Sequence, residues 1–230
     1  MTSNIDGAGA PPAPDRTVHQ AEALAWLRDH APLVRASVVT SLPDISEVPT
    51  LDLAAWQGWF EEAAFQTMSA VPDDGVAIFF QSDIRQGGLW IDKGALVAQA
   101  AARARMPLLF HKIVCRKPAG TVTYGRASYS HLLGFGRAVR PALARATADV
   151  IPDAGFMPGK KSMGVNACLD ACRFVRAETT TRTIVDPFCG LGTVLAVANA
   201  LGLSAVGVDL SPRMCRRARA LRLELGAIGG

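Results

Sequence analysis

Apolar and polar residues follow two patterns along the chain, and each pattern predicts its own kind of element. Short apolar runs bounded by Gly, Pro or Asp predict buried strands, and longer stretches with an apolar residue every three or four positions predict amphipathic helices. The expected strands cover 16–20, 34–40, 76–81, 107–115, 129–136, 183–186 and 205–208. The expected helices cover 22–29, 51–68, 95–105, 162–175, 194–201 and 212–223. Because strands and helices largely alternate, we predict an α/β fold.

The remaining segments predict the domain organisation. Residues 1–15 are rich in Gly, Ala and Pro without periodicity, and we expect a disordered tail. Residues 16–230 are expected to form a single domain, with a loop over 84–94. Segment 140–161 is irregular and contains two prolines in its second half, which makes it a candidate for a mobile, substrate-facing segment.

The stretch that carries the most chemistry lies near the end of the chain. A short strand ends in Asp186 and runs into a turn that contains Gly190 and Gly192, and an apolar helix follows. A second strand then ends in Asp209, about 20 residues after the turn, where folds of this type place an acid against ribose hydroxyls. This is one βαβ unit, and its ligand is expected at the carboxyl ends of the strands.

The string Asp-Pro-Phe-Cys-Gly-Leu-Gly-Thr, residues 186–193, resembles the S-adenosylmethionine (SAM) motif of the amino-methyltransferases. These enzymes methylate the exocyclic nitrogen of adenine or cytosine. A nicotinamide-binding Rossmann unit is the alternative, although the Asp-Pro-Phe opening does not suit it. The resemblance implies SAM as the cofactor. The residues that it implies for cofactor binding are Gln20, Glu22, Asp186, Pro187, Phe188, Gly190, Gly192, Thr193, Asp209 and Leu210.

The order of the elements is unusual for that fold, because only one helix follows Asp209. Two strands do not make a stable sheet, so the other strands must come from upstream. The chain as a whole resembles a circularly permuted class of amino-methyltransferases, in which the catalytic turn precedes the SAM motif. The resemblance therefore implies a Rossmann-like, seven-stranded SAM-dependent methyltransferase fold in circularly permuted form.

The resemblance places the catalytic turn at residues 41–44, and here the sequence departs from the family. The family has (Asp/Asn/Ser)-Pro-Pro-(Tyr/Phe/Trp), whereas this chain has Ser41, a leucine, Pro43 and Asp44. Asp44 replaces the aromatic residue that stacks on the base, but it can accept hydrogen bonds from an amine or act as a general base. Alternatively, the segment is an ordinary turn in which Asp44 caps the next helix. The candidates for a substitute stacking residue are Trp90, Tyr124 and Tyr129.

Other polar residues offer weaker candidates. Ser82 and Asp83 follow a strand and could line the pocket or cap a helix. His111 and His131 lie in expected strands, where a core or surface role is the simpler interpretation. Cys189 is expected to be a packing residue, because methyl transfer to an amine needs no nucleophilic thiol.

Charge is unevenly distributed along the chain. Residues 1–100 hold 5 Lys/Arg and 13 Asp/Glu, whereas residues 101–230 hold 19 and 7. Residues 101–148 carry nine basic side chains and no acid, which suits a polyanion such as nucleic acid, RNA in particular. RNA is favoured over duplex DNA because the chain has little room for a separate domain that reads a major groove. A solvated basic face is the alternative.

Composition indicates which class of protein the chain belongs to and in which compartment it is expected. Half of the 230 residues are apolar, which is typical of a globular chain, and no apolar run is long enough to cross a bilayer. The five cysteines show no metal-site spacing, so we expect no metal and reduced thiols in the cytoplasm.

These observations favour a SAM-dependent methyltransferase that acts on a nitrogen of a nucleic-acid base. The sequence leaves two alternatives open: a small-molecule or protein N-methyltransferase, and a non-catalytic SAM-binding subunit of a larger complex.

Overall fold

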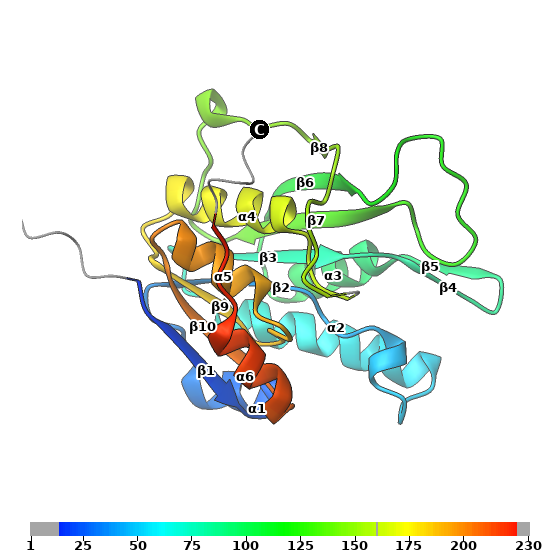
Figure 1. The fold of residues 1–230 in the computed structure, drawn as a ribbon, viewed down its shortest axis with the longest axis horizontal. Helices are drawn as coiled ribbons and strands as arrows, with labels where there is room; N and C mark the ends of the chain where they lie inside the picture. The colour runs from blue at the N-terminus through cyan, green and yellow to red at the C-terminus, as the bar shows by residue number, and fades with distance from the viewer. Residues whose placement is uncertain (1–13, 160, 225–230) are drawn as a thin grey trace, which may run out of the picture.

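The computed structural model describes residues 14–159 and 161–224, and an eight-stranded sheet forms its centre (Figure 1). The strand order is β1-β10-β9-β2-β3-β7-β6-β8. β7 is antiparallel to both of its neighbours, β3 and β6, and every other pair is parallel. The strands are β1 (Arg16–Gln20), β2 (Ala36–Thr40), β3 (Val76–Gln81), β6 (Leu108–Cys115), β7 (Tyr129–Gly136), β8 (Val150–Ile151), β9 (Thr183–Asp186) and β10 (Ser204–Asp209).

Helices cover both faces of the sheet, so the α/β prediction is confirmed (Figure 1). α1, α2 and α3 pack against one face, where Trp56 and Phe60 of α2 share a core with Phe79 of β3. α4, α5 and α6 pack against the other face, where Ile78 meets Leu195 of α5 in a second core. The helices are α1 (Ala23–His30), α2 (Leu53–Ala70), α3 (Lys93–Arg103), α4 (Val165–Glu178), α5 (Thr193–Ala200) and α6 (Pro212–Ala220).

Strands from the two ends of the chain lie side by side in this sheet. The C-terminal strands β9 and β10 are inserted between β2 and the N-terminal strand β1. The register pairs Val38 with Val185 and Gln20 with Asp209. The carboxyl ends of β1, β2, β9 and β10 therefore meet at one edge, which is where open α/β sheets bind their ligands.

The prediction of a loop over 84–94 is wrong, because the chain forms a β-hairpin there. β4 (Ile84–Gln86) pairs with β5 (Leu89–Ile91), and the turn between them is Gly87-Gly88. Both glycines have positive φ, 56° and 80°, which a two-residue hairpin turn of this kind requires. The hairpin extends from the same end of the molecule as the loop between β6 and β7, and an isolated bridge from Ile84 to Arg126 joins the two (Figure 1).

Segment 140–161 is irregular as expected, apart from η2 (Leu143–Arg145) and the short strand β8. Residues 1–13 of the expected tail lie outside the described residues. Asp15 was predicted to belong to the tail, but it is part of the fold, because its carbonyl accepts from the backbone N–H of Ala205 at 2.9 Å. Among the described residues, no helix is long and apolar enough to span a membrane.

Candidate functional site

A large cavity of about 720 Å³ opens at the carboxyl ends of β1, β2, β9 and β10. Its walls come from both ends of the chain. Most of the residues proposed for cofactor binding line it: Glu22, Asp186, Pro187, Phe188, Gly190, Thr193, Asp209 and Leu210. Gln20 and Gly192 do not.

The two glycines of the turn serve different purposes. Gly190 has a φ of +50°, and a Cβ added to it would meet no atom within 4 Å, so its backbone faces open space in the cavity. Gly192 has a φ of +77°, and a Cβ there would lie 2.8 Å from the Cβ of Ala218 on α6. Gly190 thus leaves room for a ligand, whereas Gly192 lets α6 pack against the turn.

Asp209 fixes the shape of the turn from the neighbouring strand. Its Oδ2 accepts from the backbone N–H of Gly190 at 3.1 Å, and its Oδ1 accepts from that of Ser211 at 2.7 Å. Each carboxylate oxygen can accept more than one hydrogen bond, so the group retains capacity toward the cavity.

Asp186, at the end of β9, is buried with only 4% of its surface exposed. Its Oδ1 accepts from the hydroxyl of Thr40 at 2.6 Å and from the backbone N–H of Phe188 at 3.1 Å. Burial raises the pKa of Asp186 to about 7, because the loss of hydration outweighs the two hydrogen bonds that favour its charged form.

Gln20 and Glu22 were both expected near a ligand, and only Glu22 lines the cavity. Its carboxylate also caps α1, accepting from the backbone N–H groups of Leu24 at 3.0 Å and Ala25 at 2.7 Å. An acid that follows β1 thus reaches the cavity two positions after Gln20.

The expected catalytic turn follows β2. Ser41 and Pro43 line the large cavity together with Leu42. The carbonyl of Pro43 accepts from the indole N–H of Trp56 at 3.3 Å, which ties the turn to α2.

Asp44 lies outside the large cavity and is held in a network of charged side chains. Its Oδ1 accepts from the backbone N–H of Ile45 at 3.0 Å, which caps η1 (Ile45–Glu47) as the capping alternative predicted. Its Oδ2 pairs with Arg126 at 3.1 Å, and the ammonium group of Lys93 lies 3.7 Å from Oδ1. Lys93 is only 3% exposed, and this burial lowers its pKa despite the nearby carboxylate.

A second, much smaller cavity of about 60 Å³ adjoins the first. The two cavities share Ser41, Leu42, Glu47, Lys161 and Ser162 in their walls. The smaller one adds Asp44, Lys93, Arg126 and the carboxyl end of β3. It lies beside the turn at residues 41–44.

None of the three aromatics proposed for stacking lines either of these cavities. The indole N–H of Trp90 and the hydroxyl of Tyr129 both donate to Asp83 Oδ2 at 3.3 Å, and Tyr124 is exposed. The aromatic residues in the cavity walls are Trp59 and Phe188 in the larger cavity and Phe80 in the smaller one.

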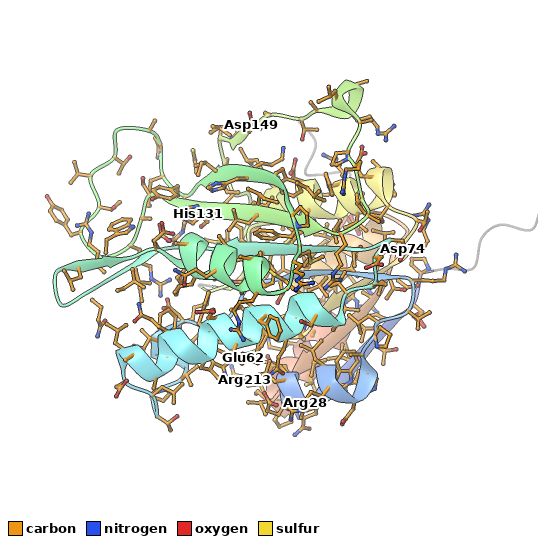
Figure 2. The ribbon with its side chains drawn as sticks, turned by 180° about the vertical axis from the view of Figure 1, so that it is seen from behind. Arg28, Glu62, Asp74, His131, Asp149 and Arg213 are labelled. Carbon is orange, nitrogen blue, oxygen red and sulfur yellow. The ribbon has the colours of Figure 1, made fainter. Side chains whose placement is uncertain are left out.

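Asp83 and the two strand histidines form a hydrogen-bonded array that the sequence did not predict. His131 lies on β7 beside α3 (Figure 2), with its Nε2 3.0 Å from Asp83 Oδ2 and its Nδ1 2.9 Å from His111 Nε2. Burial opposes the ionisation of Asp83, but hydrogen bonds from His131 and from the backbone of Lys93 hold its pKa below the ordinary value. Burial lowers the pKa of His111, with a smaller contribution from His131.

One set of three potential metal ligands occurs among the described residues. Asp83, Asp92 and His131 each place one ligand atom within 4.8 Å of the others. Both oxygens of Asp83 already accept hydrogen bonds, and Asp92 caps α3 through the backbone N–H of Ala95 at 2.8 Å. These hydrogen bonds hold Asp83, Asp92 and His131 in place.

Several wall residues were missed at the sequence level. Trp59 of α2 and the segment around Gly159, Ser162 and Met163 line the large cavity. Segment 140–161 therefore contacts the site at its end, and Ala154 and Met157 line the small cavity. The irregular composition of this segment was the signal for it, but no local pattern identified its contact residues.

The basic segment 101–148 does not form one continuous free surface. Carboxylates pair with five of its nine basic side chains, namely Arg103, Lys112, Arg126, Arg137 and Arg145. Within the described part of the chain, Arg105, Arg116, Lys117 and Arg140 have no carboxylate within 4.0 Å. The positive charge available to a ligand is thus concentrated at fewer positions than the sequence suggested.

The thiol of Cys189 is buried at the turn, and burial raises its pKa well above the usual range. A thiol that resists ionisation is a poor nucleophile, in agreement with the packing role expected for it.

No protein-family model and no curated protein matches this sequence. Solved structures do match its fold. A putative DNA modification methylase from Thermus thermophilus, in complex with S-adenosyl-L-methionine, aligns with a TM-score of 0.69 at 18% identity over 89% of this chain and 92% of that one. The cytosine-N4-specific PvuII DNA methyltransferase aligns with a TM-score of 0.67 at 14% identity, over 93% and 90%. A complex of M1.HpyAVI with SAM aligns at 0.61 and 11% identity, over 89% and 98%. The predicted SAM-dependent methyltransferase fold is therefore confirmed, but its sheet has eight strands and not the expected seven, because the two-residue strand β8 was not predicted.

Proposed function

We propose that this protein is a SAM-dependent methyltransferase that transfers a methyl group to an amino nitrogen of a nucleic-acid base. The observation that carries the proposal is the junction of the two cavities. The turn at Ser41 borders both the large cavity, which carries the glycine turn and Asp209, and the small polar cavity beside it. A cofactor in the first and an acceptor in the second would meet at this turn.

The residues of the large cavity fit SAM in size and charge. Its volume of about 720 Å³ lies in the range of small-molecule sites, and the open space over Gly190 lets a ligand approach the backbone closely. Glu22, Asp186 and Asp209 supply carboxylates for a ligand with cationic groups and ribose hydroxyls. SAM, when bound, supplies a methyl group already activated by its sulfonium.

The remaining work for the chain is positioning. We assign to the turn, through the Ser41 hydroxyl or the Leu42 carbonyl, the task of accepting one N–H of the acceptor amine, which helps to aim the nitrogen lone pair at the methyl group. The Pro43 carbonyl and the Asp44 carboxylate stabilise the turn through their hydrogen bonds with Trp56 and Ile45. The nitrogen loses one proton to an oxygen acceptor or to water as the new bond forms.

The proposal also extends to which nucleic acid, DNA or RNA, carries the methylated base. The comparison structures are described as DNA methylases, which favours DNA and lends no support to the preference for RNA drawn from the sequence. Arg116 and Lys117, which have no carboxylate partner among the described residues, lie on the loop beside the small cavity and would contact phosphates.

A small-molecule N-methyltransferase is the second candidate. The observation that favours it is the size of the acceptor cavity, about 60 Å³, together with charged walls that suit a compact polar amine. A non-catalytic SAM-binding subunit remains the third possibility and needs no acceptor cavity.

The test is a labelling assay with methyl-tritiated SAM. Genomic DNA, denatured DNA, total RNA and a small-molecule extract are incubated in parallel with the wild type, Ser41→Ala and the control Ser69→Ala, whose serine lies exposed on α2. We expect label in a nucleic-acid fraction that is lost in Ser41→Ala and retained in Ser69→Ala. Label in the extract alone would support the second candidate. SAM binding with no label in any fraction would support the third.

A further inference from the structure

Gln81, the last residue of β3, presents a buried amide that no group of the described chain satisfies. The residue is 1% exposed, yet neither its Oε1 nor its Nε2 has a hydrogen-bond partner among the described residues. It lines the small cavity next to Ser41. Gln81 thus borders the space assigned to the acceptor, with its amide buried directly behind the wall.

The fold does not account for a glutamine at this position. The five preceding residues of β3, Val-Ala-Ile-Phe-Phe, are all apolar and buried. Sheet pairing of position 81 with His131 is formed by the backbone and does not need the side chain. An unsatisfied buried amide destabilises a protein, so an apolar residue of similar size would serve the sheet better.

The neighbouring polar groups already have partners of their own. Asp44 is held by Arg126 and by the cap of η1, and Ser82 Oγ lies 2.5 Å from Ser130 Oγ. Among the described wall residues of this cavity, Gln81 is therefore the deeply buried one whose donor and acceptor groups are both free. Its amide offers a carbonyl oxygen and an N–H side by side.

We infer that Gln81 recognises the acceptor through a paired hydrogen bond to an amino group and the ring nitrogen next to it, an edge that adenine and cytosine present. Oε1 accepts one N–H of the amino group and Nε2 donates to the ring nitrogen, while the Ser41 turn holds the other N–H. Thymine and uracil lack the amino group that would be methylated. This inference rests on the proposed function and names the base class for the same site.

The experiment compares Gln81→Leu and Gln81→Glu with the wild type, using whichever nucleic-acid fraction the wild type labels. For Gln81→Leu we expect the KM for nucleic acid to rise about 10- to 100-fold, which is the range for loss of a bidentate base contact. SAM affinity should stay unchanged, and Tm should stay level or rise. In Gln81→Glu a carboxylate faces the lone pair of the ring nitrogen, so activity should fall at neutral pH and recover in part as the pH is lowered.

The matched control is Thr67→Val. Thr67 is also fully buried with an unsatisfied side-chain oxygen, but it lies on α2 and lines no described cavity. Its replacement should leave the KM unchanged. An unchanged KM in Gln81→Leu, a lowered Tm in that variant, or methylation of a base other than adenine or cytosine would overturn the inference. Absence of any labelled nucleic acid with the wild type would instead contradict the proposed function itself.

Discussion

The hydroxyl of Thr40 donates a hydrogen bond of 2.6 Å to Oδ1 of Asp186, between residues 146 positions apart in the chain. Thr40 ends β2 and Asp186 ends β9, and the two strands pair in parallel. The same oxygen accepts from the backbone N–H of Phe188, so the bond couples the proposed catalytic turn to the glycine turn. This contact ties together the two strand ends from which the proposed cofactor and acceptor sites extend.

Asp186 should make folding stability depend on pH. Burial raises its pKa from 3.8 to about 7, so the folded state binds the proton more tightly than the unfolded state does. The stabilisation is full below about pH 4 and is lost as the pH rises through about 7. The loss amounts to at most roughly 4 kcal/mol, at about 1.4 kcal/mol per unit of pKa. In Asp186→Asn this pH-dependent part of the free energy of unfolding should vanish. Urea unfolding at pH 8 should therefore give a higher free energy of unfolding for Asp186→Asn than for the wild type.

Asp29→Asn, at an exposed position on α1, serves as the control and should keep the wild-type pH profile. Parallel pH profiles for the wild type and Asp186→Asn would show that Asp186 is already ionised near pH 4 in the folded state.

SAM binding should release a proton from the same group. A cation bound in the large cavity favours the charged form of Asp186 and lowers its pKa, so the carboxyl group ionises when the ligand binds near pH 6.5. Calorimetric titrations in two buffers of different ionisation enthalpy should report up to about one proton released per SAM bound. Asp186→Asn should release none. Equal heats in both buffers would contradict the expected proximity of Asp186 to the cationic ligand.

The fold could be predicted from the sequence because its signals are local. The apolar runs at 76–81 and 183–186 identified strands, and the glycine turn with Asp209 identified the ligand-binding edge. The placement of β9 and β10 in a sheet built largely from upstream strands was also predicted, and their pairing with β2 and β1 confirms it. The hairpin at 84–91 was missed because its strands are only three residues long and Gly87-Gly88 was read as loop composition.

The acceptor side of the site was harder to predict, because its chemistry depends on contacts that are distant in sequence. Asp44 pairs with Arg126, which lies 82 residues away in the chain, and with Lys93, the first residue of α3. No sequence spacing predicts either ion pair. Gln81 looks unremarkable in the sequence, because its unsatisfied amide becomes visible only when every neighbour has been placed. Both glycines of the SAM-like turn were assigned to a ligand, whereas the packing of Ala218 explains Gly192.

Alanine at the two glycines should separate ligand binding from packing. Gly190→Ala adds a methyl group in open space at positive φ, so it should cost about 1–2 kcal/mol of stability and weaken SAM binding at least about tenfold. Gly192→Ala adds similar backbone strain and a clash with Ala218, and should cost about 2–5 kcal/mol. Urea denaturation and SAM titration of both variants provide the measurement. A larger stability loss in Gly190→Ala than in Gly192→Ala would refute this assignment.

The ion pair between Asp44 and Lys93 should be energetically coupled. Both side chains are nearly buried, so Asp44→Asn leaves the Lys93 ammonium without its carboxylate, and removal of one partner of such a pair costs about 3–5 kcal/mol. The double variant Asp44→Asn/Lys93→Met removes the stranded cation and should recover much of that loss. A double-mutant cycle from urea unfolding should give a coupling energy above about 1 kcal/mol. The exposed pair of Arg103 and Glu62 is the matched control, and Glu62→Gln should cost less than about 1 kcal/mol. A coupling energy near zero, with Asp44→Asn as mild as Glu62→Gln, would mean that the Asp44 carboxylate is not what stabilises the Lys93 ammonium.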